Sequence, residues 1–250
     1  MFKTLKAKSG VRYGISGADS KEPSPILLNI ANDIESTLQM DQFNKIGCIL
    51  EQQGFRTATL DSPCHGRDQR KNEPEGMLGW RKRMEKGEPF IEEFSARASA
   101  VMDDLIASGR ADPERIVLCG TSRGGFLALH LAAAEPRPKC VVAFAPLTHP
   151  YVLREFAGAE ENPAVRQTAL THIAPKLAGR SIWVVIGSND YRVETDQVIG
   201  FTRRVIEESM LQNKPYGLEL HVVGSDGHGL PEDAHEQAAA WVSKQLAPEK

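Results

Sequence analysis

The chain has 250 residues, of which 41% are hydrophobic and 25% are charged, and its formal net charge is −3. This composition is typical of a globular protein and excludes a chain that is mainly disordered, because the apolar content is high and the net charge is small. It also argues against nucleic-acid binding through bulk charge, since 33 acidic residues outnumber 30 basic residues. Single α/β domains of this length are common, so we expect one domain over residues 1–250.

The first predicted elements are two strands joined by a tight turn. Apolar positions over residues 2–7 and 11–15, with Ser9 and Gly10 between them, predict a β-hairpin. Residues 26–28 then form a short continuous apolar run, Ile-Leu-Leu, which is typical of a strand buried on both faces.

From this strand onward, helices and strands alternate. Helical spacing of apolar residues predicts helices over residues 36–53, 90–108, 122–134, 194–212 and 232–246. Short apolar runs predict strands over residues 55–60, 116–119, 140–145, 182–186 and 218–223. Strands separated by helices form largely parallel sheets with helices on both faces. With the hairpin included, the sequence predicts an α/β fold with a mostly parallel eight-stranded sheet.

Two long connections interrupt this alternation. Residues 62–89 and 147–175 are rich in proline, glycine and charged residues. Connections of this length in compact domains are usually functional lids or mobile loops. We therefore expect them to form a small lid-like insertion.

Neither membrane insertion nor export is expected. The first ten residues alternate apolar and basic side chains without the long apolar core of a secretory signal, and no apolar run approaches the roughly 18 residues needed to cross a bilayer. The cysteines form no CxxC pair and have no histidines at zinc spacing; they are Cys48, Cys64, Cys119 and Cys140. We expect a cytoplasmic protein with reduced thiols and no metal or organic cofactor.

A candidate nucleophile lies at the junction of a predicted strand and helix. The sequence Gly120-Thr-Ser122-Arg-Gly124 has the pattern Gly-x-Ser-x-Gly, directly after the strand at 116–119. A serine on such a sharp turn projects its hydroxyl from the sheet edge, and the glycines leave room for the close approach of strand and helix. Ser122 is therefore predicted to be a nucleophile.

A serine nucleophile needs a base, and the base needs an orienting acid. Asp190 follows the strand at 182–186, at the sheet edge where catalytic groups of α/β proteins gather, whereas Glu194 and Asp196 fall in the first turn of the next helix. His228 follows the last predicted strand in the glycine-rich segment Asp-Gly-His-Gly. The chain order serine, acid, histidine suits this class of sheet, so Asp190 is the predicted acid and His228 the predicted base.

Together these motifs resemble the α/β-hydrolase superfamily, in particular its dienelactone-hydrolase and prolyl-oligopeptidase-like esterases. The carriers are Gly-Thr-Ser-Arg-Gly-Gly at 120–125, Gly-Ser-Asn-Asp-Tyr-Arg-Val at 187–193, Asp-Gly-His-Gly at 226–229 and an Asp-x-Pro-x-His-Gly loop at 61–66. The resemblance implies the α/β-hydrolase fold, a catalytic triad and an oxyanion hole of backbone N–H groups.

The chain departs from this family pattern in two places. Hydrolases usually carry His-Gly after the strand at 26–28, where this chain has Asn-Ile-Ala-Asn at 29–32. Because the oxyanion donors are backbone groups, Ile30 or Ala31 can supply one N–H and Arg123 the other. Many peptidase relatives carry an aromatic residue where this chain has Arg123. Its side chain either reaches the substrate or a lid carboxylate, or lies on the surface.

The resemblance implies hydrolysis of an ester through an acyl-enzyme. The modest lid segments favour small or short-acyl esters over long lipids. His149, Tyr151 and Trp80 are candidate substrate-binding residues, and the competing interpretation is ordinary packing or a solvated helix face. Three alternatives stay open: a small peptidase of prolyl-oligopeptidase type, a slow-turnover ligand-binding protein on the same fold, and a non-hydrolytic chemistry, such as that of a lyase, with the same triad. We expect a small-molecule partner, no nucleic acid and no membrane, and the oligomeric state is open.

Overall fold

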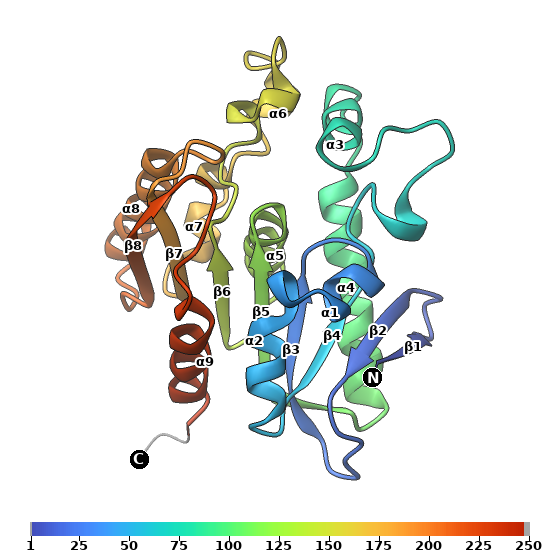
Figure 1. Cartoon of the computed structure of the whole chain (residues 1–250). Coiled ribbons are helices and arrows are strands. Elements are labelled where there is room, and N and C mark those ends of the chain that lie inside the picture. The colour runs from blue at the N-terminus through green and yellow to red at the C-terminus, as the bar shows by residue number, and fades with distance from the viewer. Residues whose placement is uncertain (1, 248–250) are drawn as a thin grey trace.

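The structure, a computed structural model, describes residues 2–247 and in them forms one mixed sheet of eight strands (Figure 1). The strand order across the sheet is β1-β2-β4-β3-β5-β6-β7-β8. The strands are β1 (Lys3–Lys6), β2 (Arg12–Ser16), β3 (Ser24–Ile30), β4 (Arg56–Thr59), β5 (Ala111–Thr121), β6 (Cys140–Phe144), β7 (Ser181–Asn189) and β8 (Leu218–Asp226).

Six of these strands run parallel, and only the N-terminal hairpin is antiparallel. β1 pairs with β2, and β2 pairs with β4, in antiparallel register; β3 to β8 pair in parallel. The central strands are buried on both faces, in agreement with their continuous apolar runs. The predicted α/β-hydrolase architecture is confirmed, including the hairpin and the number of strands.

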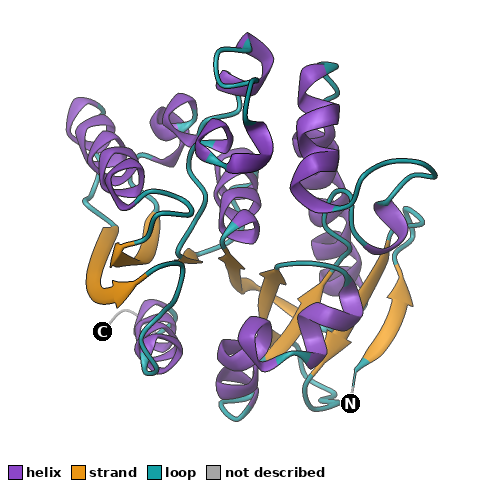
Figure 2. Cartoon of the chain, turned by 45° about the horizontal axis from the view of Figure 1, so that its top comes forward, coloured by secondary structure: helices purple, strands orange, loops and turns teal. Residues whose placement is uncertain are grey.

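Helices cover both faces of the sheet (Figure 2). On one face, α2 and α9 bury side chains such as Ile46 and Trp241 against the sheet. On the other face, α4, α5 and α8 bury Phe94, Phe126 and Phe201. The helices are α1 (Ile34–Gln39), α2 (Asp41–Glu51), α3 (Gly76–Glu85), α4 (Phe90–Ala107), α5 (Arg123–Ala134), α6 (Pro163–Arg166), α7 (Ala174–Leu177), α8 (Thr195–Leu211) and α9 (Ala234–Gln245).

The helix predicted over residues 36–53 is two helices. Asp33 caps α1 by accepting hydrogen bonds from the backbone N–H groups of Glu35 and Ser36, so this helix begins earlier than predicted. Met40 has extended backbone angles and separates α1 from α2. The apolar spacing continues across this break without glycine or proline, which explains why the pattern did not reveal it.

The two long connections lie at the carboxyl edge of the sheet and contact each other. Residues 62–89 contain α3, and residues 147–175 contain α6, several 3₁₀ turns and the start of α7; α3 and α6 stand together above the sheet in Figure 1. Arg81 of α3 donates hydrogen bonds to the carbonyl oxygens of Glu155 and Ala157, at 3.1 and 2.9 Å. Their function as a lid stays a prediction.

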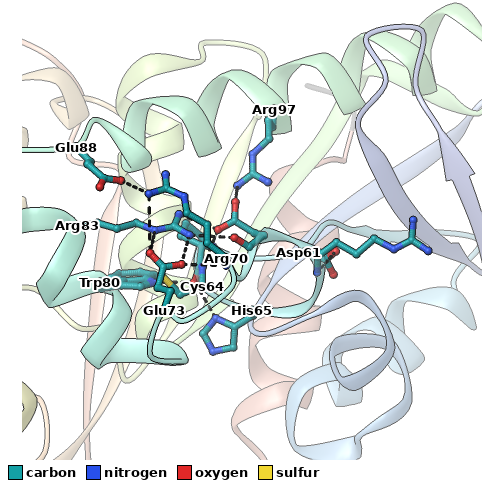
Figure 3. Close-up of polar contacts among 12 residues, drawn as sticks. Asp61, Cys64, His65, Arg70, Glu73, Trp80, Arg83, Glu88 and Arg97 are labelled. Atoms are coloured by element: carbon teal, nitrogen blue, oxygen red, sulfur yellow. Dashed lines mark hydrogen bonds and ion pairs between the residues drawn. The ribbon is translucent and has the colours of Figure 1, made fainter.

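A buried ionic cluster anchors the first of these segments (Figure 3). The Arg83 side chain, only 3% exposed, donates to Asp68 at 2.8 Å and to both carboxylate oxygens of Glu73 at 2.7 and 2.9 Å. Asp68 in turn accepts the N–H of Cys64 at 2.7 Å and pairs with Arg97 of α4. The cluster therefore ties residues 64–83 to a long helix of the core.

Among residues 2–247, no helix is long and apolar enough to cross a membrane. Within the same residues, no group of three or more histidine, cysteine or acidic side chains is arranged to hold a metal ion. The four cysteines are free thiols, and all but Cys48 are buried.

Candidate active site

Ser122 lies on a sharp turn between β5 and α5. Its backbone has φ 55° and ψ −115°, a left-handed region that non-glycine residues rarely adopt. The turn is held from both sides, because Ser122 N–H donates to the carbonyl of Phe144 at 2.8 Å and the Ser122 carbonyl accepts from Leu147 N–H at 3.0 Å. The Ser122 side chain forms no capping hydrogen bond with α5, so its hydroxyl is not used to start the helix. Strained angles that the surrounding structure enforces are common at active sites.

The glycines of this turn are required by close backbone packing. A Cβ atom at Gly120 would lie 2.2 Å from the backbone of Gly124, and a Cβ atom at Gly124 would lie 1.8 Å from the carbonyl oxygen of Ile30. Neither contact can be relieved by moving a flexible side chain. The two glycines of the Gly-x-Ser-x-Gly pattern are therefore needed because β5, α5 and the loop that follows β3 approach one another closely.

Asp190 and His228 meet at the carboxyl ends of β7 and β8. His228 Nδ1 lies 2.6 Å from Asp190 Oδ2. Because a carboxylate only accepts, Nδ1 carries the proton, and Nε2 of the neutral ring has a free lone pair. The other oxygen, Asp190 Oδ1, accepts the backbone N–H groups of Arg192 and Val193 at 2.9 and 3.2 Å. The carboxylate is thus held at both oxygens.

The pKa of Asp190 reflects two opposed effects. Burial of its side chain raises the pKa, but the hydrogen bond and charge of His228 and the N–H groups of Val193 and Arg192 outweigh burial and lower it below the usual value. The carboxylate is therefore ionised at neutral pH. An ionised acid in this position fixes the imidazole tautomer and stabilises an imidazolium.

A cavity of about 480 Å³ brings these groups together. Ser122, Arg123, Ala31, Arg192 and His228 line it. None of the three candidate acids, Asp190, Glu194 and Asp196, is a lining residue, and Asp190 reaches the cavity through its contact with His228. Of the acids weighed from the sequence, Asp190 is the one that contacts the histidine.

The loop after β3 contributes one wall of this cavity. Ile30 is the last residue of the strand and is fully buried in register with Gly120, whereas Ala31 lines the cavity. The Asn32 N–H is already bonded to Thr37 Oγ1 at 3.0 Å. Arg123 is the first residue of α5, and the first N–H groups of a helix have no intrahelical acceptor. Of the three residues predicted to supply oxyanion donors, Ala31 and Arg123 line the cavity and Ile30 does not.

Asp61, which follows the neighbouring strand β4, supports the segment after β3. Its Oδ1 accepts the N–H of Ile34 at 3.0 Å, and its Oδ2 accepts the N–H of Arg67 at 3.2 Å. His65, in the same loop, has Nδ1 2.8 Å from the carbonyl of Pro63. Both side chains support the backbone, and neither lines the cavity with Ser122.

The model of the prolyl oligopeptidase family matches residues 97–248, which is more than half of the chain. The chain belongs to the prolyl oligopeptidase family. It is therefore a serine hydrolase of the α/β-hydrolase type. A search of curated protein sequences finds no match to this chain.

Solved structures share the fold at low sequence identity. TT1662 from Thermus thermophilus is 19% identical with a TM-score of 0.71, over 100% of this chain and 99% of that chain. A cold-adapted esterase from an Arctic intertidal metagenomic library is 14% identical with a TM-score of 0.69, over 98% and 93% of the two chains. Dipeptidyl peptidase 4 from Porphyromonas gingivalis is 18% identical with a TM-score of 0.70, over 98% of this chain and 35% of that chain. The present family member thus spans about a third of this peptidase.

The three predicted substrate-binding residues do not line the cavity of this family member. Trp80 is fully buried: its indole N–H donates to the Pro63 carbonyl at 2.8 Å, and its ring packs against Phe126. It belongs to the core because the apolar face of α3 turns inward. His149 is also buried and packs edge-on against Tyr151 within residues 147–175, with ring centroids 5.3 Å apart.

Several cavity residues were not predicted from the sequence. Gln42 and Phe43 come from the start of α2, and Leu230 and His235 from the segment entering α9. His235 packs on Phe144 at 4.5 Å, and its Nδ1 is buried without a partner among the described residues. The sequence offered one signal for His235, a lone histidine among alanines in a predicted helix, but its approach to the cavity depends on how α9 packs.

Proposed function

We propose that this serine hydrolase cleaves small or short-acyl carboxylic esters with Ser122 as nucleophile, His228 as base and Asp190 as orienting acid. The observation that carries the proposal is the 2.6 Å contact between His228 Nδ1 and Asp190 Oδ2, at the cavity that Ser122 also lines. Ser122 and His228 line one cavity and Asp190 contacts His228, which supports the chemical order that acyl transfer needs.

In the proposed first step, His228 Nε2 takes the proton of the Ser122 hydroxyl as the oxygen attacks the ester carbonyl. The imidazolium that forms is stabilised by the ionised Asp190. It then gives its proton to the departing alcohol as the acyl-enzyme forms. A water molecule attacks the acyl-enzyme with His228 again as base, which releases the acid and restores Ser122.

The negative charge of each tetrahedral intermediate needs fixed donors. We assign these to the backbone N–H groups of Ala31 and Arg123, because both residues line the cavity. Removing one such donor typically costs about 10²–10³ in rate. Ile30, the other residue considered from the sequence, is less suitable because it is buried in strand pairing.

The substrate class is supported by the size of the cavity. A volume of about 480 Å³ is in the range of sites for small molecules. We place the enzyme in the cytoplasm, since its four cysteines are free thiols and three of them are buried.

Labelling with a fluorophosphonate tests the nucleophile. The serine oxygen displaces fluoride from phosphorus, so intact mass should show one phosphonyl adduct on the wild type and none on Ser122→Ala. As a matched control, Ser225→Ala removes a hydroxyl near the end of β8 that hydrogen-bonds the Gly229 carbonyl, and this variant should still be labelled. A folded wild type that takes no label would overturn the assignment and favour the slow-turnover binding protein.

Peptidase activity is the second candidate, and the family match favours it. The peptidase neighbour is about three times as long as this chain, so much of its structure has no counterpart here. Rates with 4-nitrophenyl acetate and butyrate should be compared with rates for aminoacyl 4-nitroanilides. We expect esters to be cleaved far faster; faster cleavage of the anilides would replace the esterase proposal by the peptidase.

A further inference from the structure

The side chain of Arg123 lines the same cavity as its neighbour Ser122. A second cation, Arg192, also lines this cavity, but both of its terminal nitrogens bond to the carboxylate of Glu155, each at 2.6 Å. Both terminal nitrogens of Arg192 are thus already engaged by a carboxylate of the protein. Within residues 2–247, Arg123 has no such partner, because no carboxylate oxygen lies within 4.0 Å of its guanidinium.

The hydrogen-bonding capacity of Arg123 is also largely unused. A guanidinium has five N–H donors. The acceptor found for them among the described residues is the side-chain oxygen of Asn32, which lines the cavity as well. The Nε–H of Arg123 is buried and has no partner there. The Nη1 group also bonds no described residue and, unlike Nε, is not enclosed, so it is the donor open to a ligand in the cavity.

The first lid-like segment passes beside this guanidinium. Gly76 begins α3 with φ +63°, and a Cβ atom there would lie 3.7 Å from His65 Nε2 and 4.0 Å from Arg123 Nη1. The side chain of Glu75 is exposed and acts on Arg123 through its charge without pairing with it. Burial and the charge of Arg192 lower the pKa of Arg123, as expected for a cation short of acceptors.

We propose that Arg123 binds a carboxylate carried by the substrate, so that this enzyme prefers acidic esters to neutral esters of the same shape. A guanidinium matches a carboxylate with two parallel hydrogen bonds, which an uncharged group cannot reproduce. The inference rests on the proposed function, since Arg123 is placed next to Ser122 as the nucleophile. The carboxylate can be on the acyl side or on the leaving-group side of the ester.

Two matched pairs of substrates test this preference. The mono-4-nitrophenyl ester of glutaric acid against 4-nitrophenyl pentanoate places the charge on the acyl side. 4-Acetoxybenzoate against 4-acetoxybenzamide places it on the leaving group. For one pair at least, wild-type kcat/KM should favour the charged ester by about tenfold or more, mainly through KM. Spontaneous hydrolysis is subtracted in each case.

Variants separate recognition from bulk charge. Arg123→Gln should bring the charged-to-neutral ratio close to one, and Arg123→Lys should leave an intermediate ratio because it keeps charge without the planar fork. The control Arg203→Gln makes the same charge change on the exposed face of α8 and should keep the wild-type ratio. Independently of any variant, glutarate should slow fluorophosphonate labelling of the wild type more than glutaramide does.

Failure of this inference is distinguishable from failure of the proposed function. If Ser122 is labelled and neutral esters are hydrolysed, but the charged-to-neutral ratio is near one or unchanged in Arg123→Gln, the carboxylate proposal is wrong and the esterase stands. If the folded wild type neither takes the label nor cleaves any ester, both are wrong.

Discussion

The imidazole of His228 and the carboxylate of Asp190 are 38 residues apart in the chain and 2.6 Å apart in space. Adjacent parallel strands make this contact possible. β7 and β8 are neighbours in the sheet, and Asn189 pairs with Asp226 in their register, so the residues that follow each strand leave the same edge side by side. A second bond, from Asn189 Nδ2 to Asp226 Oδ1 at 2.8 Å, joins the two strand ends.

Replacing Asp190 by Asn should reduce kcat by about 10⁴-fold, the loss typical when the acid of a triad becomes an amide that favours the wrong histidine tautomer. Protein stability should change far less than activity. Asp196→Asn, in the exposed first turn of α8, is the matched control and should keep near wild-type kcat. Steady-state kinetics on a short-acyl ester measure both, and equal losses in the two variants would remove Asp190 from the mechanism.

Gly124→Ala should impair both rate and stability. The added methyl would lie 1.8 Å from the Ile30 carbonyl oxygen, so either α5 or the loop after β3 must move. We expect a loss of kcat of about 10²-fold or more from the displaced oxyanion donors, and destabilisation of about 1–3 kcal/mol. Gly200→Ala, in the open interior of α8, should instead stabilise by up to about 1 kcal/mol. Urea unfolding measures the stability of both variants, and steady-state kinetics measure their kcat. If Gly124→Ala kept the stability and kcat of the wild type, the packing argument would be wrong.

Arg83→Met should destabilise the protein by about 3 kcal/mol, the lower end for the loss of one partner of a buried ion pair, because Glu73 loses its main cation while Asp68 keeps Arg97. Lys139→Met breaks an exposed pair with Glu114 and should cost less than about 1 kcal/mol. The hydrogen bonds from Arg83 are the main reason that the pKa of Glu73 falls to about 2. Chemical denaturation at neutral pH gives both free energies, and similar values for the two variants would show that the cluster does not anchor its segment.

His149 should make stability depend on pH. Burial, with the charges of His172 and Arg166, lowers its pKa to about 4. The unfolded chain binds a proton at this position below its ordinary pKa of about 6.5, while the folded protein does not until about 4. The free energy of unfolding should therefore fall as pH decreases from 6.5 to 4. His149→Gln keeps a partner for Thr148 and should make this decrease shallower; parallel curves for the two proteins would contradict the assignment.

The sequence predicted the sheet and the positions at its carboxyl edge, because strand ends and glycine turns are local signals. Ser122, Asp190 and His228 were all placed by the strand that each one follows. Long-range packing decided the rest. The helix face that turns Trp80 into the core and the approach of His235 to the cavity both depend on contacts between distant elements, which apolar spacing does not report.

The contact between Gly124 and Ile30 joins main chain to main chain, so the spacing of the two proposed oxyanion donors does not depend on any side chain. Substitutions elsewhere in the cavity can therefore change which ester fits without altering how its carbonyl is held. The side chains free to vary come from α2 and the segment before α9, where Gln42, Phe43 and Leu230 face the cavity. In the proposed site, main-chain N–H groups hold the charge of the intermediate, whereas side chains, that of Arg123 among them, select the ester.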